Sequence, residues 1–173
     1  MEKQLTCPLC KGSFPVFANP APTTDVIIHA PDGRVVLIAR KNEPLGWALP
    51  GGFVDEGEYV EDAARREMQE ETVLDVVLEG LLGVYSRPDR DPRRHTQTTV
   101  FVGFPADPSA LKAGDDAGSA VWIDPGNPPS PLCFDHARML ADYLEYRAGR
   151  RALASLSTDW LATPQGRAAG RKA

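Results

Sequence analysis

The chain has 173 residues, a length that suits one domain of ordinary size better than two. Its composition, 42% apolar and 25% charged, is that of a folded protein, and a formal net charge of −5 gives no reason to expect binding to nucleic acid or anionic lipid. No stretch approaches the roughly 20 apolar residues of a membrane span, and the N-terminus lacks the apolar core of a signal peptide. Three cysteines cannot form a closed set of disulfides, and one CxxC pair is more typical of a reducing compartment, so we expect a cytoplasmic protein.

The first 22 residues differ from the rest of the chain. The segment Cys7-Pro8-Leu9-Cys10 has the spacing of half a zinc ribbon, and a proline-rich stretch follows it. This composition predicts a knuckle and a linker over 1–22, rather than part of a sheet. A structural zinc site needs four ligands, and the remaining cysteine, Cys133, is far away in the sequence. We therefore expect a metal-free knuckle, with no zinc at Cys7 and Cys10.

The middle of the chain begins with strand-like sequence. Two apolar runs, 26–30 and 35–39, flank a Pro-Asp-Gly turn and predict a β-hairpin. The stretch 41–57 is rich in glycine and proline and predicts a loop. Helix-forming sequence follows over 59–72.

The second half contains further strands and one more helix. Strand-like runs at 81–85 and 98–104 are separated by a polar insert, and a Gly/Asp loop at 113–119 leads to another short run. A last helix is predicted over 134–153. Strands before and after helices predict an α+β fold, a mixed sheet with helices packed on it. We assign 23–155 to one domain and 156–173 to a flexible tail.

The predicted helix over 59–72 carries acidic residues on the face that should be apolar. At about 100° per residue, Ala64 and Met68 define an inward stripe. Glu67 and Glu71 fall on that stripe, and Glu70 borders it. Glu67 and Glu71 are also i, i+4 neighbours, so their like charges destabilise the helix.

Two interpretations of this helix are open. A glutamate run is commonly a solvated face, and Arg66 can pair with Glu70 at i+4. However, no cation of the same helix is well placed for Glu67 or Glu71, and burying an unpaired carboxylate costs several kcal/mol. A divalent cation would offset that charge, and Mg²⁺ suits a few carboxylates combined with substrate phosphates. The segment Gly51-Gly52 can bring its backbone close to the same point and present a carbonyl, so the pattern indicates metal-assisted phosphate chemistry.

Read in register, this region resembles the Nudix box of the Nudix hydrolases: Gly52-x5-Glu58-x7-Arg66-Glu67-Met68-x-Glu70-Glu71-x-Val73-Leu74. All seven specified positions from Gly52 to Glu71 match over 20 residues. One position departs, because Val73 stands where the pattern has glycine, which leaves the turn after the helix open to question. The resemblance covers roughly 23–138 and implies the Nudix α/β/α sandwich around a mixed β-sheet.

The resemblance also implies hydrolysis of a nucleoside diphosphate linked to another moiety. It implies that Mg²⁺ or Mn²⁺ is held by three glutamates and one backbone carbonyl: Glu67, Glu70, Glu71 and Gly51. It further implies that Arg66 and Glu58 orient these glutamates as catalytic residues of the box. The cation would neutralise phosphate charge and activate a water.

Two shorter segments narrow the choice within the family. The segment 86–96 looks like the RDPRxHT segment of ADP-ribose pyrophosphatase-like members, and 113–117 is similar to their acidic loop, which carries a catalytic carboxylate. Four arginines so close together suit bidentate recognition of a phosphate, which makes them candidate substrate-binding residues: Arg87, Arg90, Arg93 and Arg94. An exposed charged turn with internal Asp–Arg pairs is the alternative interpretation of this segment.

Three further acidic residues enter the expected site. Asp115 and Asp116 are candidates for the general base, and Glu70 is the alternative base. Asp25, at the opening of the first strand, could brace the arginines or touch substrate, although a plain role at a strand edge is the simpler interpretation.

These features support three function hypotheses. The first is hydrolysis of ADP-ribose or a related ADP-sugar, with ADP-ribose giving AMP and ribose 5-phosphate. The second is a nucleoside triphosphate pyrophosphohydrolase, and the third is a Nudix-derived ligand sensor or regulator. With the first we expect a nucleotide-sugar substrate, Mg²⁺ with Mn²⁺ as the alternative cation, no nucleic acid or membrane partner, and a homodimer, as is common among ADP-ribose-type relatives.

Overall fold

The computed structural model describes residues 2–114 and 117–156. A short 3₁₀ helix, Pro108–Ala110, lies between strands β8 and β9. The other elements are, in chain order, β1 (Glu2–Thr6), β2 (Ser13–Phe17), β3 (Ala21–Ile28), β4 (Val35–Arg40), β5 (Trp47–Ala48), β6 (Gly51–Phe53), α1 (Val60–Thr72), β7 (Val76–Tyr85), β8 (Thr96–Pro105), β9 (Ala117–Ile123) and α2 (His136–Arg147).

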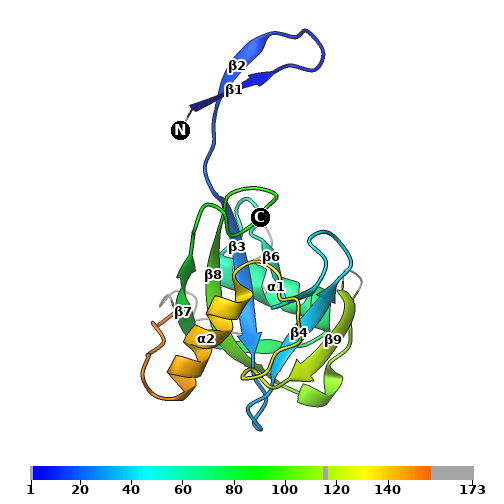
Figure 1. The fold of residues 1–173 in the computed structure, drawn as a ribbon, viewed down its shortest axis with the longest axis vertical. Coiled ribbons are helices and arrows are strands. Elements are labelled where there is room, and N and C mark those ends of the chain that lie inside the picture. Colours follow the sequence, from blue (N-terminus) through cyan, green and yellow to red (C-terminus); the bar gives the residue numbers. More distant parts are fainter. Residues whose placement is uncertain (1, 115–116, 157–173) are drawn as a thin grey trace.

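Two sheets build the body of the protein (Figure 1). The larger sheet has the order β6-β3-β8-β7; β3 and β8 are parallel, and the other neighbours are antiparallel. The smaller sheet has the order β5-β4-β9 and is antiparallel. The larger sheet is therefore mixed, as the sequence predicts.

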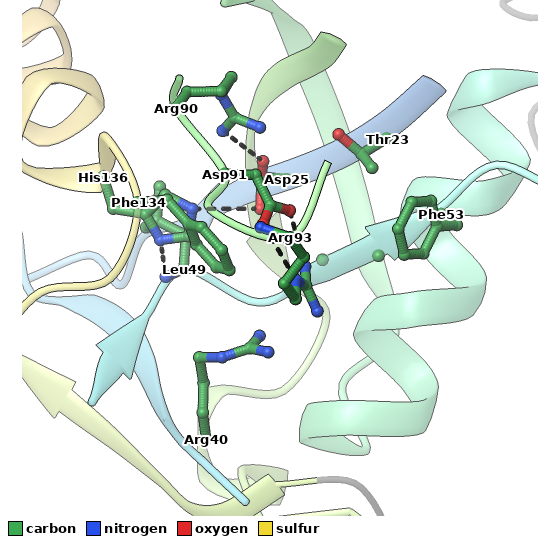
Figure 2. Close-up of a pocket in the computed structure, with 12 residues that line it drawn as sticks. Thr23, Asp25, Arg40, Leu49, Phe53, Arg90, Asp91, Arg93, Phe134 and His136 are labelled. Atoms are coloured by element: carbon green, nitrogen blue, oxygen red, sulfur yellow. Dashed lines mark hydrogen bonds and ion pairs between the residues drawn. The ribbon is translucent and has the colours of Figure 1, made fainter. Parts of the chain in front are cut away.

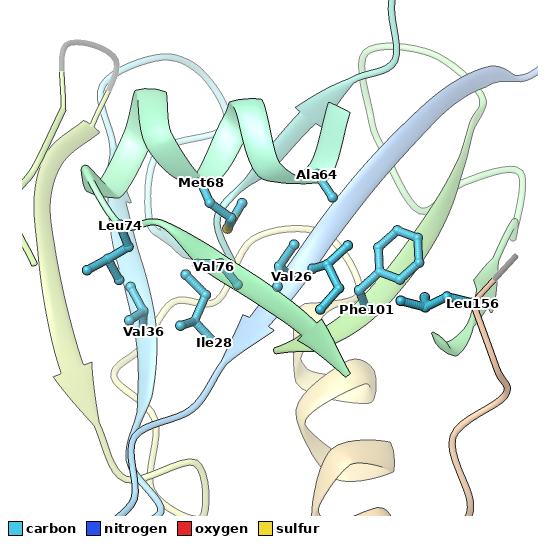
Figure 3. Close-up of a cluster of buried hydrophobic side chains, with 10 residues drawn as sticks. Val26, Ile28, Val36, Ala64, Met68, Leu74, Val76, Phe101 and Leu156 are labelled. Atoms are coloured by element: carbon cyan, nitrogen blue, oxygen red, sulfur yellow. The ribbon is translucent and has the colours of Figure 1, made fainter. Parts of the chain in front are cut away.

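The central strand β3 explains the layering. Successive side chains of a strand point to opposite faces. Val26 and Ile28 join a buried cluster with Met68 of α1, and Figure 3 shows these side chains meeting beneath the helix. Ile27 joins a different cluster with Leu140 of α2. Because the two helices cover opposite faces, the molecule is an α/β/α sandwich, and the predicted α+β class is confirmed.

Several element predictions are confirmed and one is too long. The helix predicted over 59–72 is α1. The run at 81–85 is the second half of the longer strand β7, and the run at 98–104 lies within β8. The helix predicted over 134–153 is shorter in the structure, where α2 begins at His136 and ends at Arg147.

Three predictions about local structure are wrong. Residues 1–22 are not free of sheet, because β1 and β2 pair in an antiparallel hairpin with the two cysteines in its turn. The turn before Arg34 is present, but β3 and β4 share only the bridge between His29 and Val35 before they enter different sheets. The stretch 41–57 contains β5 and β6, and β6 pairs with β3 through only three residues. Strands this short give little periodic signal in a sequence.

The β1–β2 hairpin projects from the body of the molecule (Figure 1). Among the described helices, neither is long and apolar enough to cross a membrane.

Candidate active site

Helix α1 places the three box glutamates at different depths. The helix buries Ala64 and Met68 completely. Glu71, on the same side, is 8% exposed, and the side chain of Glu67 is 14% exposed. The side chain of Glu70 is 53% exposed and lies at the border of this face. The helical-wheel prediction, in which two of the glutamates fall on the inward stripe, is therefore confirmed.

Arg66 connects the other charged residues of the box. Its Nε and Nη2 donate to the two carboxylate oxygens of Glu58, at 3.1 and 3.0 Å. Its Nη1 donates to Glu67 Oε1 at 2.8 Å and to Glu70 Oε2 at 3.1 Å, and Nη2 also donates to the carbonyl oxygen of Phe53. The forked guanidinium thus fixes both glutamates relative to strand β6.

Two glycines of β6 let the strand approach the glutamates closely. The backbone N–H of Gly51 donates to Glu71 Oε2 at 2.8 Å. A Cβ atom on Gly51 would collide with Thr24 and Asp25 of the paired strand β3, and a Cβ on Gly52 would collide with the carboxylate of Glu67. Only glycine therefore fits at Gly51, whereas a side chain at Gly52 would displace the carboxylate of Glu67.

Burial disfavours the ionised form of two of the box glutamates, Glu67 and Glu71. Burial raises the pKa of Glu71 to about 8, against the lowering effect of the Gly51 N–H, and burial also raises the pKa of Glu67. No three His, Cys, Asp or Glu side chains converge in the described part of the chain, and Arg66 and the Gly51 N–H engage the carboxylates of Glu67 and Glu71. Arg66 pairs with Glu67, although the sequence offered no well-placed cation for it, whereas Glu71 accepts the neutral N–H of Gly51. A buried carboxylate such as Glu71 fits a divalent cation such as Mg²⁺.

A cavity of about 320 Å³ opens beside these glutamates. Glu67, Glu71 and Arg66 line one side, which we call the acidic wall. Three basic residues, which we call the basic wall, also line this cavity: Arg40, Lys41 and Arg93. The volume lies within the range of sites for small molecules, and the paired charges suit a cation on one side and an anion on the other.

The basic wall is built around an aromatic ring (Figure 2). The guanidinium of Arg40 lies 5.0 Å from the ring centroid of Phe134, and that of Arg93 lies 5.3 Å from the same centroid. Arg40 also donates to the carbonyl oxygen of Pro44, and Arg93 makes a two-pronged ion pair with Asp91. Cation–π contact and ion pairing together hold two guanidinium groups at the cavity.

Behind this wall lies a buried polar network. Arg90 is almost completely buried and donates to Asp135 through Nε and Nη2, and to Thr96 through Nη1. Asp25 accepts a hydrogen bond of 2.6 Å from Thr98 and lies 3.6 Å from Nε2 of His136. Burial raises the pKa of Asp25 to about 6. Asp25 has no strand-edge role, because β3 is paired on both sides, so that interpretation is wrong.

The remaining arginines of the segment 86–96 differ from Arg93. Arg87 is exposed and pairs with Asp89, as the interpretation of a charged turn expects. The guanidinium of Arg94 lies 5.7 Å from the ring centroid of Phe53, at the rim of the same region. Of the four predicted substrate-binding arginines, Arg90 and Arg93 line the hollow drawn in Figure 2, which adjoins the main cavity.

The chain entering the predicted acidic loop at 113–117 lies against the last turn of helix α1. Asp115 and Asp116 lie outside the described residues. The preceding Gly114 donates its N–H to the carbonyl oxygen of Glu71 at 2.9 Å, and a Cβ there would collide with the carbonyl of Glu70. The chain therefore enters this loop in contact with the backbone of the box glutamates.

The departure from the box pattern has a clear structural consequence. Val73 caps α1 with φ of 61°, in the left-handed region that favours glycine, and donates its N–H to the carbonyl oxygen of Gln69. The left-handed turn at the end of the helix therefore forms with valine in place of the glycine that best suits this conformation.

Sequence reasoning missed several residues of the site. Arg40, Lys41 and Phe134 line the cavities but lie outside the box and the arginine segment. His136, the first residue of α2, is buried and accepts the N–H of Leu49 through Nδ1. No spacing rule links these positions, since the fold brings them together from separate elements.

The comparisons with known proteins agree with this geometry. The family model for the NUDIX domain matches residues 19–143. The chain belongs to the Nudix family. By family and fold it is a Nudix pyrophosphohydrolase, an enzyme class that uses divalent metals.

Three relatives place the chain within the family. An ADP-ribose pyrophosphatase of Methanocaldococcus jannaschii is 46% identical over 138 residues, which cover 79% of this chain and 80% of that protein. The NUDIX domain of Shewanella oneidensis NrtR, crystallised with ADP ribose, superposes with a TM-score of 0.63 at 26% identity, covering 76% of this chain and 90% of that one. A Francisella tularensis bifunctional NMN adenylyltransferase/ADP ribose pyrophosphatase, complexed with AMP and a manganese ion, gives a TM-score of 0.64 at 28% identity, covering 75% of this chain and 42% of that one.

Proposed function

We propose that this chain hydrolyses the pyrophosphate bond of ADP-ribose, giving AMP and ribose 5-phosphate. The observation that carries the proposal is the single cavity lined both by the glutamates of the acidic wall, Glu67 and Glu71, and by the basic wall. A diphosphate with bound cations has the matching distribution of charge. The name of the Methanocaldococcus jannaschii relative and the ADP ribose complex of the Shewanella domain support this choice of substrate.

The acidic wall would hold the cation. Glu67, Glu70 and Glu71, with the carbonyl of Gly51, are the proposed ligands. We propose Mg²⁺ as the cation, with Mn²⁺ as the alternative. When bound, the cation supplies charge neutralisation for the diphosphate and a lowered pKa for an attacking water.

The protein's own groups would position the other components. Arg66 keeps Glu67 and Glu70 in place through the hydrogen bonds described above, with Glu58 bracing the guanidinium. Arg93 would bind substrate phosphate, with Arg40 beside it on the same ring. For substrate binding by Arg87, Arg90, Arg94 and Asp25 we keep the expectation from the sequence.

The base that removes a proton from water is proposed to be Asp115 or Asp116, with Glu70 as the alternative. Asp115→Asn or Asp116→Asn should lower kcat with little change in KM, because a base acts in the transition state and contributes little to substrate binding. Near-normal kcat in both variants would assign the role to Glu70. A homodimer, a cytoplasmic location and the lack of a nucleic acid partner stay predictions.

A substrate panel tests the proposal. Purified enzyme with Mg²⁺ is assayed against ADP-ribose, NADH, diadenosine polyphosphates and nucleoside triphosphates, with products separated by ion-exchange chromatography. We expect the highest kcat/KM for ADP-ribose, with AMP and ribose 5-phosphate in equal amounts. Faster hydrolysis of a nucleoside triphosphate, with release of pyrophosphate, would favour the second hypothesis. Binding of ADP-ribose without turnover would favour the sensor.

A further inference from the structure

The β1–β2 hairpin has no role in the site described above. It is a two-stranded sheet that projects from the body (Figure 1). Leu5 and Phe14 are paired across its strands and share one face with Val16; Leu5 is 48% exposed and Phe14 is 44% exposed. An isolated two-stranded hairpin is at best marginally stable in water. Units this small generally need a metal, a disulfide or a partner chain to hold them together.

The turn of this hairpin brings two thiols together. The N–H of Cys7 donates to the carbonyl oxygen of Gly12 at 2.9 Å, and the N–H of Lys11 donates to the carbonyl oxygen of Cys7 at 3.0 Å. Lys11 has φ of 61°, so the chain reverses directly after Cys10. Hydrogen bonding from the backbone N–H of Cys10, from that of Leu9 and from the Cys10 thiol lowers the pKa of the Cys7 thiol, which favours a thiolate in this turn.

A single chain supplies only half of the ligands that a closed thiolate site needs. Structural zinc is almost always bound by four ligands in a tetrahedral arrangement, and a CxxC turn contributes two of them. Cys133 cannot contribute, because it is buried in the body and donates to the carbonyl oxygen of Pro44. Within residues 2–114 and 117–156, no third His, Cys, Asp or Glu joins the pair.

We propose that Cys7 and Cys10 bind zinc together with Cys7 and Cys10 of a second copy of this chain. Two-fold pairing repeats the same two ligands and so completes a four-thiolate site. The same pairing can cover the apolar hairpin faces that carry Leu5 and Phe14. The expectation of a metal-free knuckle considered one chain only, and two chains double the number of ligands. The proposed stoichiometry is one zinc per two chains.

Metal content and spectroscopy test this proposal on the full-length protein. The reduced protein is stripped of metal, loaded with Zn²⁺, passed over a desalting column and analysed by mass spectrometry for zinc per chain. The double variant Cys7→Ser/Cys10→Ser, treated in parallel, measures zinc held by the box glutamates. After subtraction we expect 0.5 zinc per chain, and light scattering should show a zinc-loaded species of at least two chains. Loading with Co²⁺ should give the intense thiolate charge-transfer bands of a four-sulfur site.

The controls separate this site from catalysis and from the third cysteine. Cys133→Ala should keep 0.5 zinc per chain. Cys7→Ser alone should lose the zinc, while its hydrolysis of ADP-ribose with Mg²⁺ stays within twofold of wild type, because the hairpin lies outside the cavity. The proposal is overturned by one zinc per chain, by a zinc-loaded monomer, by a cobalt spectrum of only two thiolates, or by no zinc above the double variant. Quantitative Cys7–Cys10 disulfide in the purified protein, with no zinc taken up after reduction, would assign the pair to redox chemistry instead.

Discussion

The two walls of the cavity are assembled in different ways. The acidic wall comes from two adjacent segments, β6 and the inward side of α1. The basic wall combines the end of β4, the loop before β8 and the residue before the turn into α2. The acidic wall is therefore fixed by helical spacing, whereas the basic wall exists only once the sheets and α2 are packed. We expect the acidic wall to control turnover and the basic wall to control substrate affinity.

The largest effect is expected from Glu71→Gln on the acidic wall. Glutamine keeps the shape and can still accept the Gly51 N–H, but it removes the charge that a cation requires. We expect kcat for ADP-ribose to fall roughly 100-fold or more, since metal ions contribute several kcal/mol to transition-state stabilisation. Glu61→Gln, on the same helix but outside the cavity, should stay within about threefold of wild type. Steady-state kinetics measures both variants, and circular dichroism checks that each is folded. A Glu71→Gln enzyme as active as the Glu61→Gln control would contradict the proposed metal site.

A smaller effect is expected from Arg66→Lys. Lysine keeps the positive charge but cannot bind Glu58 with two donors and Glu67 at the same time. We expect the Mg²⁺ concentration for half-maximal activity to rise by about 10-fold or more, as is typical when residues that orient metal ligands are lost. Arg65→Lys, one position away and facing Asp75, should leave it unchanged. An unchanged Mg²⁺ requirement in Arg66→Lys would show that the glutamates hold their positions without the guanidinium.

The basic wall is tested by Arg93→Ala. We expect KM for ADP-ribose to rise about 10-fold with kcat nearly unchanged, because a charge-assisted hydrogen bond to phosphate contributes roughly 1.5 kcal/mol or more to binding. Arg34→Ala, which removes an exposed arginine paired with Asp32, is the matched control. Should kcat fall instead while KM stays the same, the two walls would not divide binding and turnover as proposed.

The same contrast explains what could be predicted from the sequence. Glu67, Glu70 and Glu71 could be placed because a helix has a fixed period, and Ala64 and Met68 show where its inner face lies. Arg40 and Phe134 could not be placed, since nothing in their own neighbourhood marks them and only tertiary packing brings them together.

The sheet shows the same limit. Its class could be predicted from the strand-like runs, but the partners of β3 and β4 could not. The turn at Gly33 suits a hairpin, yet burial of β3 between β6 and β8 outweighs local pairing with β4.

The buried network behind both walls gives a pH prediction for His136. Burial lowers the pKa of His136 to about 3, well below the 6.5 expected in the unfolded chain, so protons bind the unfolded chain more readily. Its contribution to stability is complete above pH 6.5 and is lost as the pH falls toward 3, by about 1.4 kcal/mol per pH unit. The raised pKa values of Asp25 and Glu71 change the stability in the opposite direction over their own pH ranges. The contribution of His136 is therefore isolated by comparing wild type with a variant that lacks this imidazole.

His136→Gln provides that difference, because glutamine can accept the N–H of Leu49 but does not titrate. The gap in free energy of unfolding between wild type and His136→Gln, measured with urea, should shrink by about 1 kcal/mol between pH 6.5 and 5.5, because the full slope is reached only below the unfolded pKa. A gap that is constant over this range would mean that His136 takes up protons equally in the folded and unfolded protein, so that its pKa is not lowered.

The smallest effect is expected at the end of the acidic wall, from Val73→Gly. A non-glycine residue in the left-handed region costs roughly 1–2 kcal/mol, and Val73 has φ of 61°. Glycine removes this cost but adds about 0.5–1 kcal/mol of backbone entropy to the unfolded chain. Val73 is 40% exposed and is absent from the buried core, so glycine should lose little packing. We expect a gain of up to about 1 kcal/mol and a melting temperature about 2–4 °C higher. Val73→Ala keeps a side chain in the left-handed conformation and should show no comparable gain in stability. This control separates the effect of relieving the backbone from the effect of removing the valine side chain. A Val73→Gly protein that melts at or below the wild-type temperature would mean that the valine contributes packing that offsets its backbone strain.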